Sequence, residues 1–326
     1  MSAEPVWVLL GPHVGDNNQL LRLAGELGLP FRTIELRYNP IHLLQPELLG
    51  PTLASLDRDS ASRIQPPWPR LVLGSGHRSV PIALAIRDLS GGSARLVRLG
   101  NPRFDPAAFD LVVTTPQYRV VDAPNVIRLE TAIGTAPKVE PAREEAQWLD
   151  KLQRPHRLLL IGGGTFMWKL EPLFLDAAAS TLRAKPGGSV VAVSSGRTDP
   201  AAMTAVAKAL RGSEHGLVWG RFPRYPVVLN DADEIYVTAD SVAMVSDAIA
   251  TGKPVGLVLP TKTLAGRLFY ALEKLGISVP VRDVRRFWSH AARQRFAGTI
   301  DDPVASDVGT HSLDKAVSTV RGLLET

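Results

Sequence analysis

Short apolar segments alternate with helical segments along the whole chain, and this alternation restricts the possible fold more than any other feature. Residues 6–10, 71–73 and 157–161 are typical of buried strands, and each is followed by a polar turn and then a helical segment. Strands separated by helices form parallel sheets with right-handed crossovers. The sequence therefore predicts an α/β protein. The expected elements include strands at 111–114 and 217–219 and helices at 19–27, near 51–62, at 140–152 and at 172–184.

The alternation runs twice, with a break near residue 140. Three prolines surround a charged helical segment within residues 134–157, as is typical of a domain boundary. A chain of 326 residues is long enough for two domains. We expect two doubly wound Rossmann-like domains facing a cleft, one at 1–138 and one at 139–310. Residues 311–326 should form a terminal helix that packs back on the first domain.

Composition limits the classes of partner. The formal net charge is +5, from 37 basic and 32 acidic residues. The chain has no run of five lysines or arginines and no basic stretch interleaved with aromatic residues, so nucleic acid is not the expected partner. An anionic small molecule or an anionic membrane surface fits this charge at least as well. Because the chain has no cysteine, disulfides, thiolate zinc sites and cysteine nucleophiles are excluded.

Targeting signals are not apparent. The apolar run at Val6–Leu10 is short and lacks a basic segment before it, so we interpret it as a first strand and not as a signal peptide. No apolar stretch approaches the 18 residues or so that a spanning helix needs. We therefore expect a cytoplasmic protein, with peripheral contact at the inner membrane as a further expectation.

The most informative unit lies at residues 237–255, which read VTADSVAMVSDAIATGKPV. An apolar strand leads through Thr238, Asp240 and Ser241 into a helix, and a second apolar strand follows. Open α/β sheets bind ligands at the carboxyl ends of their strands. Asp240 or Ser241 would cap the helix, whose amino end suits a phosphate. Asp247, close to two turns into the helix, would accept hydrogen bonds from a sugar diol, although capping alone would also explain a polar turn here.

Two more strands of the second half end in turns that suit a phosphate. Residues 162–165 (GGGT) follow an apolar strand, and three glycines can expose consecutive N–H groups as an anion nest, although the P-loop spacing is absent. Arg197, in the turn SSGRT at 194–198, offers a planar fork for a diphosphate. A tight structural turn and a solvated arginine are the alternatives.

The first half offers two polar turns. The loop at 11–19 (GPHVGDNNQ) carries His13 and Asp16, and either of them could act as a general base. The turn at 74–79 (GSGHRS) lacks the third glycine of a dinucleotide fingerprint, but its histidine and arginine could contact an anion or an acceptor. Helix caps and surface side chains are the structural alternatives at both places.

Other chemistry is disfavoured. Asp231 and Asp233 match a D-x-D metal pattern, but they precede a strand at the edge away from the expected site. The seven histidines form no H-x-x-x-H pair, and no G-x-S-x-G elbow is present. We therefore predict no metal site and no serine hydrolase. The basic stretch 282–295 with Trp288 would suit a membrane surface, but a solvated helix face is the preferred interpretation.

Several blocks together resemble the mitochondrial-fission "elongated mitochondria" family, which has many bacterial members and a GT-B-like fold. The blocks that carry the resemblance span most of the chain and are GDNNQ (15–19), PWPRLVLGSGHRSVPIA (67–83), FDLVVTTP (109–116), LLLIGGG (158–164), SGRT (195–198) and VTADSVAMVSDAIATGKPV (237–255). More distantly, the chain is similar to GT-B glycosyltransferases and sugar-nucleotide epimerases.

The resemblance implies a nucleotide-sugar domain in the second half and an acceptor domain in the first. It implies that a nucleotide-diphosphate sugar, with no other cofactor and no metal, is held by Gly163, Gly164, Thr165, Arg197, Thr238, Asp240, Ser241 and Asp247. His13 or Asp16 would deprotonate the acceptor, for which an anionic lipid or glycan is expected. A glycosyltransferase is the first hypothesis, and an epimerase or a non-catalytic adaptor with a vestigial site is the alternative.

Four positions differ from the family pattern. Asp247 stands where the family usually has a glutamate, and Gly196 stands where it usually has a second arginine. Gln117 and Tyr118 stand where the family tends to have a histidine and an aspartate. The loss of this last pair favours the alternative hypothesis.

Overall fold

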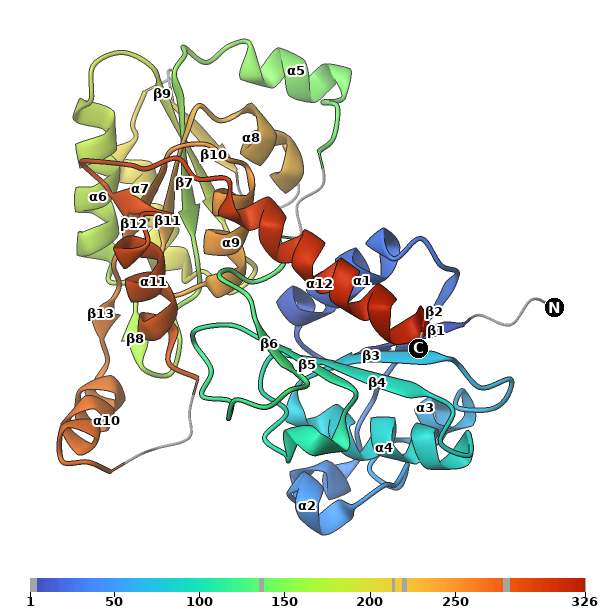
Figure 1. Cartoon of the computed structure of the whole chain (residues 1–326). Coiled ribbons are helices and arrows are strands. Elements are labelled where there is room, and N and C mark those ends of the chain that lie inside the picture. Colours follow the sequence, from blue (N-terminus) through green and yellow to red (C-terminus); the bar gives the residue numbers. More distant parts are fainter. Residues whose placement is uncertain (1–4, 135–137, 213–214, 219–221, 278–281, 326) are drawn as a thin grey trace. The chain divides into compact units, whose positions relative to one another are not determined.

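The chain divides into two compact units, each built around one six-stranded sheet (Figure 1). The computed structural model describes residues 5–134, 138–212, 215–218, 222–277 and 282–325. The first unit is Met1–Ile133 with His311–Thr326, and the second is Gly134–Thr310. Every strand pair within the two large sheets is parallel, as the alternation of strands and helices predicts.

The sheet of the first unit has the strand order β2-β1-β3-β4-β5-β6. Its strands are β1 (Val6–Leu10), β2 (Phe31–Glu35), β3 (Leu71–Ser75), β4 (Arg95–Leu99), β5 (Leu111–Thr114) and β6 (Val126–Arg128). Its helices are α1 (Val14–Glu26), α2 (Pro46–Leu49), α3 (Arg58–Ser62), α4 (Val80–Leu89) and α12 (Val308–Glu325), with short 3-10 turns at Pro40–Leu43, His77–Ser79 and Pro106–Ala108. The order reverses between β1 and β3, where doubly wound folds bind ligands.

Alternate residues of β1 enter two different layers of core. Val6 and Val8 pack in one apolar cluster and Trp7 and Leu9 in the other, so both faces of the strand are buried. The terminal helix α12 contributes Val320 to the first of these clusters. Full burial of an aliphatic side chain contributes about 1.5–3 kcal/mol, so these two layers hold the first sheet and α12 together.

The sheet of the second unit has the strand order β10-β9-β7-β11-β12-β14. Its strands are β7 (His156–Ile161), β9 (Ser189–Ser194), β10 (Gly216–Val218), β11 (Glu234–Thr238), β12 (Val255–Val258) and β14 (Gly298–Thr299). A two-stranded antiparallel pair is formed by β8 (Trp168–Lys169) and β13 (Thr261–Lys262). The helices are α5 (Arg143–Leu149), α6 (Pro172–Ala184), α7 (Pro200–Ala209), α8 (Tyr225–Asp231), α9 (Val242–Ala250), α10 (Leu264–Lys274) and α11 (Val284–Arg293).

Some element boundaries differ from those the sequence predicts. The first helix, expected from residue 19, begins at Val14, because the Asn17 side chain binds both the N–H (2.9 Å) and the C=O (2.8 Å) of Gly11 and closes the turn earlier. The helix expected near 51–62 is reduced to Arg58–Ser62, capped by Asp57. The expected charged helix at 140–152 is reduced to Arg143–Leu149. Residue 219, the last of one expected strand, lies outside the described residues.

Candidate functional site

Strand order in the second sheet brings three predicted turns to one place. β7 lies between β9 and β11, and the carboxyl ends are level, since Ile161 pairs with Ser194 and Leu160 with Val237. The order reverses between β7 and β11, so this edge is the switch point of the second sheet. The turns after β9, β7 and β11 are therefore neighbours, which sequence order alone does not require.

The glycine turn after β7 is held by side chains from the turn after β11. The Gly162 N–H donates to Thr238 Oγ1 at 2.8 Å, and the Gly164 N–H donates to Asp240 Oδ2 at 2.9 Å. A Cβ atom on Gly162 would lie 2.4 Å from Asp240 Oδ2, so only glycine allows this approach. Thr238 and Asp240 are buried and point toward the turn, where they fix its shape.

The turn after β9 packs on the same glycines from the other side. A Cβ atom on Gly163 would lie 2.4 Å from Arg197 Cβ and 2.6 Å from Arg197 O. Thr198 Oγ1 donates to the carbonyls of Ile161 (2.8 Å) and Gly162 (2.9 Å) and accepts from the Ser195 N–H at 2.8 Å. The sequence indicated Arg197 but not this bridging role of Thr198.

The sequence left Asp240 and Ser241 as alternatives for the N-cap of α9, and the structure identifies Ser241. Ser241 is the N-cap residue, and its Oγ accepts from the Met244 N–H at 3.5 Å. Asp240 instead faces the glycine turn. Burial raises the pKa of Asp240, although hydrogen bonds from Thr238 and Gly164 work in the opposite direction. The buried Oδ1 of Asp240 has no partner among the described residues.

Two donors at this place are not used by the chain itself. Among the described residues, the Gly163 N–H and the Arg197 guanidinium have no hydrogen-bond partner, and Arg197 is exposed. The first backbone N–H groups of α9 are a third group of donors, because the N–H groups in the first turn of a helix have no acceptor within the helix. Thr165 is different, since its N–H donates to Trp168 O at 2.7 Å and its Oγ1 accepts from the Trp168 N–H. The arrangement can hold an anion at the amino end of α9.

Asp247 has a partner that the sequence analysis did not identify. It is buried, and its Oδ2 accepts a hydrogen bond from the Tyr225 hydroxyl at 3.1 Å. Burial, followed by the charge of Asp247, holds the pKa of Tyr225 well above its ordinary value. Tyr225 is the first residue of α8 and stands between two prolines, which is the sequence signal that could have marked it.

The two acid–base candidates of the first unit lie at the start of α1. His13 is the N-cap residue, although its side chain makes no cap hydrogen bond, and Asp16 lies in the first helical turn. The Asp16 N–H donates to His13 O at 3.1 Å. Both residues follow β1 at the carboxyl edge of the first sheet, next to the turn after β3.

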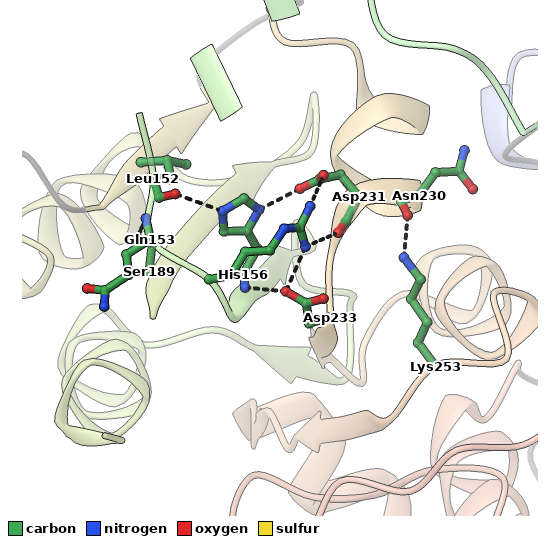
Figure 2. Close-up of polar contacts among 9 residues, drawn as sticks. Leu152, Gln153, His156, Ser189, Asn230, Asp231, Asp233 and Lys253 are labelled. Atoms are coloured by element: carbon green, nitrogen blue, oxygen red, sulfur yellow. Dashed lines mark hydrogen bonds and ion pairs between the residues drawn. The ribbon is translucent and has the colours of Figure 1, made fainter. Parts of the chain in front are cut away.

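The D-x-D pair takes part in a structural network at the opposite edge of the second sheet (Figure 2). His156 Nδ1 lies 2.6 Å from Asp231 Oδ2, and the His156 N–H donates to Asp233 Oδ2 at 2.7 Å. Arg154 forms ion pairs with both aspartates. In the part of the chain that the structure describes, no group of three or more metal-binding side chains is found.

The basic stretch forms α11, and its tryptophan is part of the core. Trp288 is buried with its ring 4.6 Å from that of Trp168, so it is not available to a surface. Arg285 is paired with Glu273 at 3.2 Å and stacks over the ring of Tyr270. Within the described residues no helix is long and apolar enough to cross a bilayer.

Comparisons with solved structures identify the fold. An S. aureus MnaA–UDP co-structure is similar, with 12% identity, a TM-score of 0.51, and coverage of 98% of this chain and 96% of that chain. Arabidopsis thaliana UGT89C1 complexed with UDP-L-rhamnose has 12% identity, a TM-score of 0.51, and coverage of 96% and 98%. These matches confirm the expected fold class, an α/β GT-B-like fold with two doubly wound parallel sheets.

Sequence comparison identifies the family. A search among curated proteins finds no match. The family model described as Mitochondrial fission ELM1 matches residues 14–300, which is most of the chain and includes the glycine turn and the α9 unit. The chain therefore belongs to the Mitochondrial fission ELM1 family.

Proposed function

We propose that the second unit binds a nucleotide-diphosphate sugar and that the protein is a metal-independent glycosyltransferase of the GT-B type. The observation that carries this proposal is the junction of three turns at the switch point, with the Gly163 N–H and the Arg197 guanidinium directed to no partner of the described chain. A diphosphate would accept from both and would face the amino end of α9.

The chemistry follows from these groups. Departure of the nucleoside diphosphate places negative charge on its oxygens, and preorganised donors lower the free energy of that state. Arg197 and the α9 amides would supply this stabilisation. Thr238 and Asp240 would act through the glycine turn that they hold. Asp247 would receive the ribose hydroxyls beside Tyr225, and His13 or Asp16 would take the proton of the acceptor hydroxyl.

A binding panel tests the proposal. UDP-, GDP-, ADP- and CMP-sugars are added at millimolar concentration, and the melting temperature is measured for wild type, Arg197→Ala and Arg211→Ala. At 100 times the Kd, a ligand adds about 2.7 kcal/mol of stability. Loss of a charge-assisted hydrogen bond of about 1.5–3 kcal/mol weakens binding roughly tenfold to a hundredfold in Arg197→Ala. Arg211 is exposed after α7, before β10, and its variant should behave as wild type.

The panel also separates the alternatives. Product analysis by NMR of any sugar nucleotide that binds distinguishes transfer or hydrolysis from inversion at a sugar carbon, which would favour an epimerase. A specific reason to keep the alternatives is that Gln117 and Tyr118 stand where the family tends to have a histidine and an aspartate. Failure of every sugar nucleotide to raise the melting temperature would reject both enzymes and favour a non-catalytic adaptor.

We propose in addition an anionic lipid or glycan acceptor and peripheral contact with an anionic membrane. Support for the contact comes from α10 and its C-cap residue, since Leu264, Leu268 and Leu275 are 83%, 62% and 76% exposed. At 100° per residue these positions share one face, within about 40° of each other. Arg267 and Lys274 are exposed beside that face. An apolar face with adjacent cations suits an anionic bilayer surface.

A further inference from the structure

A buried arginine in the first unit has no carboxylate partner among the residues that the structure describes. Arg98, near the end of β4, is 1% exposed. Its Nη1 donates to Ser79 Oγ at 3.0 Å and its Nη2 donates to the carbonyl of Gly76, which are both uncharged acceptors. Among the described residues, its Nε has no hydrogen-bond partner and no carboxylate forms an ion pair with it. The cation is therefore buried without a counter-charge.

The backbone is shaped to receive this cation. Gly74 of β3 pairs with Arg98 of β4, and a Cβ atom on Gly74 would lie 2.2 Å from Arg98 Nη1. Burial lowers the pKa of Arg98 to about 10, which leaves the guanidinium protonated at neutral pH. Burial of an unpaired charge is costly in free energy. A carboxylate at this place would reduce that cost, and the described residues supply none.

Two further arginines lie at this turn and after the neighbouring strand β4. The turn after β3 carries His77 and the exposed Arg78, and the exposed Arg103 follows β4. Burial and then the charges of Arg103, Arg78 and Arg98 lower the pKa of His77. Glu47 acts on His77 in the opposite direction but more weakly than any of the three. The local field is therefore positive.

The place itself is a ligand-binding position of the fold. It lies at the carboxyl edge of the first sheet, beside the point where the strand order reverses between β1 and β3. The short turn that leads into α4 begins after Gly76, which has no side chain to cap the following amides of His77 and Arg78. The turn therefore combines these N–H groups with the buried guanidinium of Arg98 and the exposed guanidinium groups of Arg78 and Arg103.

We infer that the turn at 76–79, together with Arg98 and Arg103, is an oxyanion-binding site for a ligand that carries a phosphate or carboxylate group. The site is distinct from the diphosphate site of the second unit. It rests on the proposed function only in that the ligand would then be the acceptor, whose anionic group would be recognised here. Arg98 holds the turn in shape and adds its field, while Arg78, Arg103 and the turn amides contact the anion.

A titration with inorganic phosphate tests this inference. The full chain carrying Arg197→Ala is used, so that anion binding in the second unit is weakened, and melting temperature is followed at constant ionic strength in phosphate, acetate or chloride. We expect a saturable rise with phosphate or with acetate, and which of them acts identifies the anion. Adding Arg78→Gln with Arg103→Gln should weaken this response at least tenfold. Adding Arg95→Gln, at the amino end of the same strand, should leave it unchanged.

NMR of the histidine ring locates the site. An anion bound beside His77 should raise the pKa of that imidazole, and the His77→Gln variant identifies its resonance. No saturable response, or a response that persists in the double variant, would overturn the inference. Because no nucleotide is present, failure here leaves the sugar-nucleotide proposal intact, and failure of the sugar-nucleotide panel leaves this site intact.

Discussion

His156 and Asp231 show how side chains can be committed to structure although their types suggest chemistry. The sequence predicted that the D-x-D pair would not bind metal because it precedes a strand, and the structure gives these acids partners in Arg154 and His156. The sequence could not identify these partners, because Arg154 and His156 lie at or just before the start of β7, far from Asp231 and Asp233 along the chain.

The His156–Asp231 pair gives a prediction for stability against pH. The hydrogen bond to Asp231 raises the pKa of His156 in the folded protein. The protonated His156 therefore adds to the free energy of unfolding. This stabilisation is fully present below the unfolded pKa of about 6.5 and is lost as pH rises through the raised pKa of the folded protein. Burial works to raise the pKa of Asp231, but the hydrogen bond and charge of His156, followed by Arg154, outweigh it. The stabilisation by ionised Asp231 is present above its unfolded pKa and is lost as pH falls through its lowered pKa in the folded protein.

Chemical denaturation of wild type and His156→Asn measures this effect. The difference in unfolding free energy between the two proteins should be larger at pH 5.5 than at pH 9, because only the protonated imidazole carries the positive charge that attracts the carboxylate. The exposed His311→Asn serves as the control and should show no such difference. An equal loss of stability at both pH values would mean that His156 contributes by packing alone.

The elements themselves were largely predictable, because hydrophobic periodicity is local. Strands β1 and β5 and helix α6 have the predicted bounds. The early start of α1 was missed because it depends on the Asn17 side chain binding Gly11. The burial of Trp288 was missed because its partner Trp168 lies 120 positions earlier and meets it only in the folded unit.

Helix α10 gives a prediction at the scale of one element. Sedimentation with vesicles of anionic lipid should recover wild type, and Leu264→Glu with Leu268→Glu should reduce the bound fraction several-fold, because two exposed apolar contacts are replaced by charges that the bilayer repels. Leu173→Glu replaces a leucine of α6 that is 80% exposed and should have no effect. Equal binding of all three proteins would remove α10 from any membrane contact.

At the scale of the whole molecule, each unit is a doubly wound sheet with a reversal of strand order. In chain order within each unit, the first sheet reads 2-1-3-4-5-6 and the second reads 3-2-1-4-5-6. The sequence predicted the class of both sheets and the presence of a polar or glycine turn after β7, β9 and β11. It could not predict that Thr238 and Asp240 would bind the glycine turn, because that contact requires β7 and β11 to be neighbours.

The central claim is that these turns hold a diphosphate. A crystal structure of the full chain with bound UDP, or with the nucleotide that the panel selects, tests it most directly. We predict diphosphate oxygens within hydrogen-bond distance of the Gly163 N–H and the Arg197 guanidinium, at the amino end of α9. A diphosphate bound elsewhere, with Arg197 directed into solvent, would contradict the account.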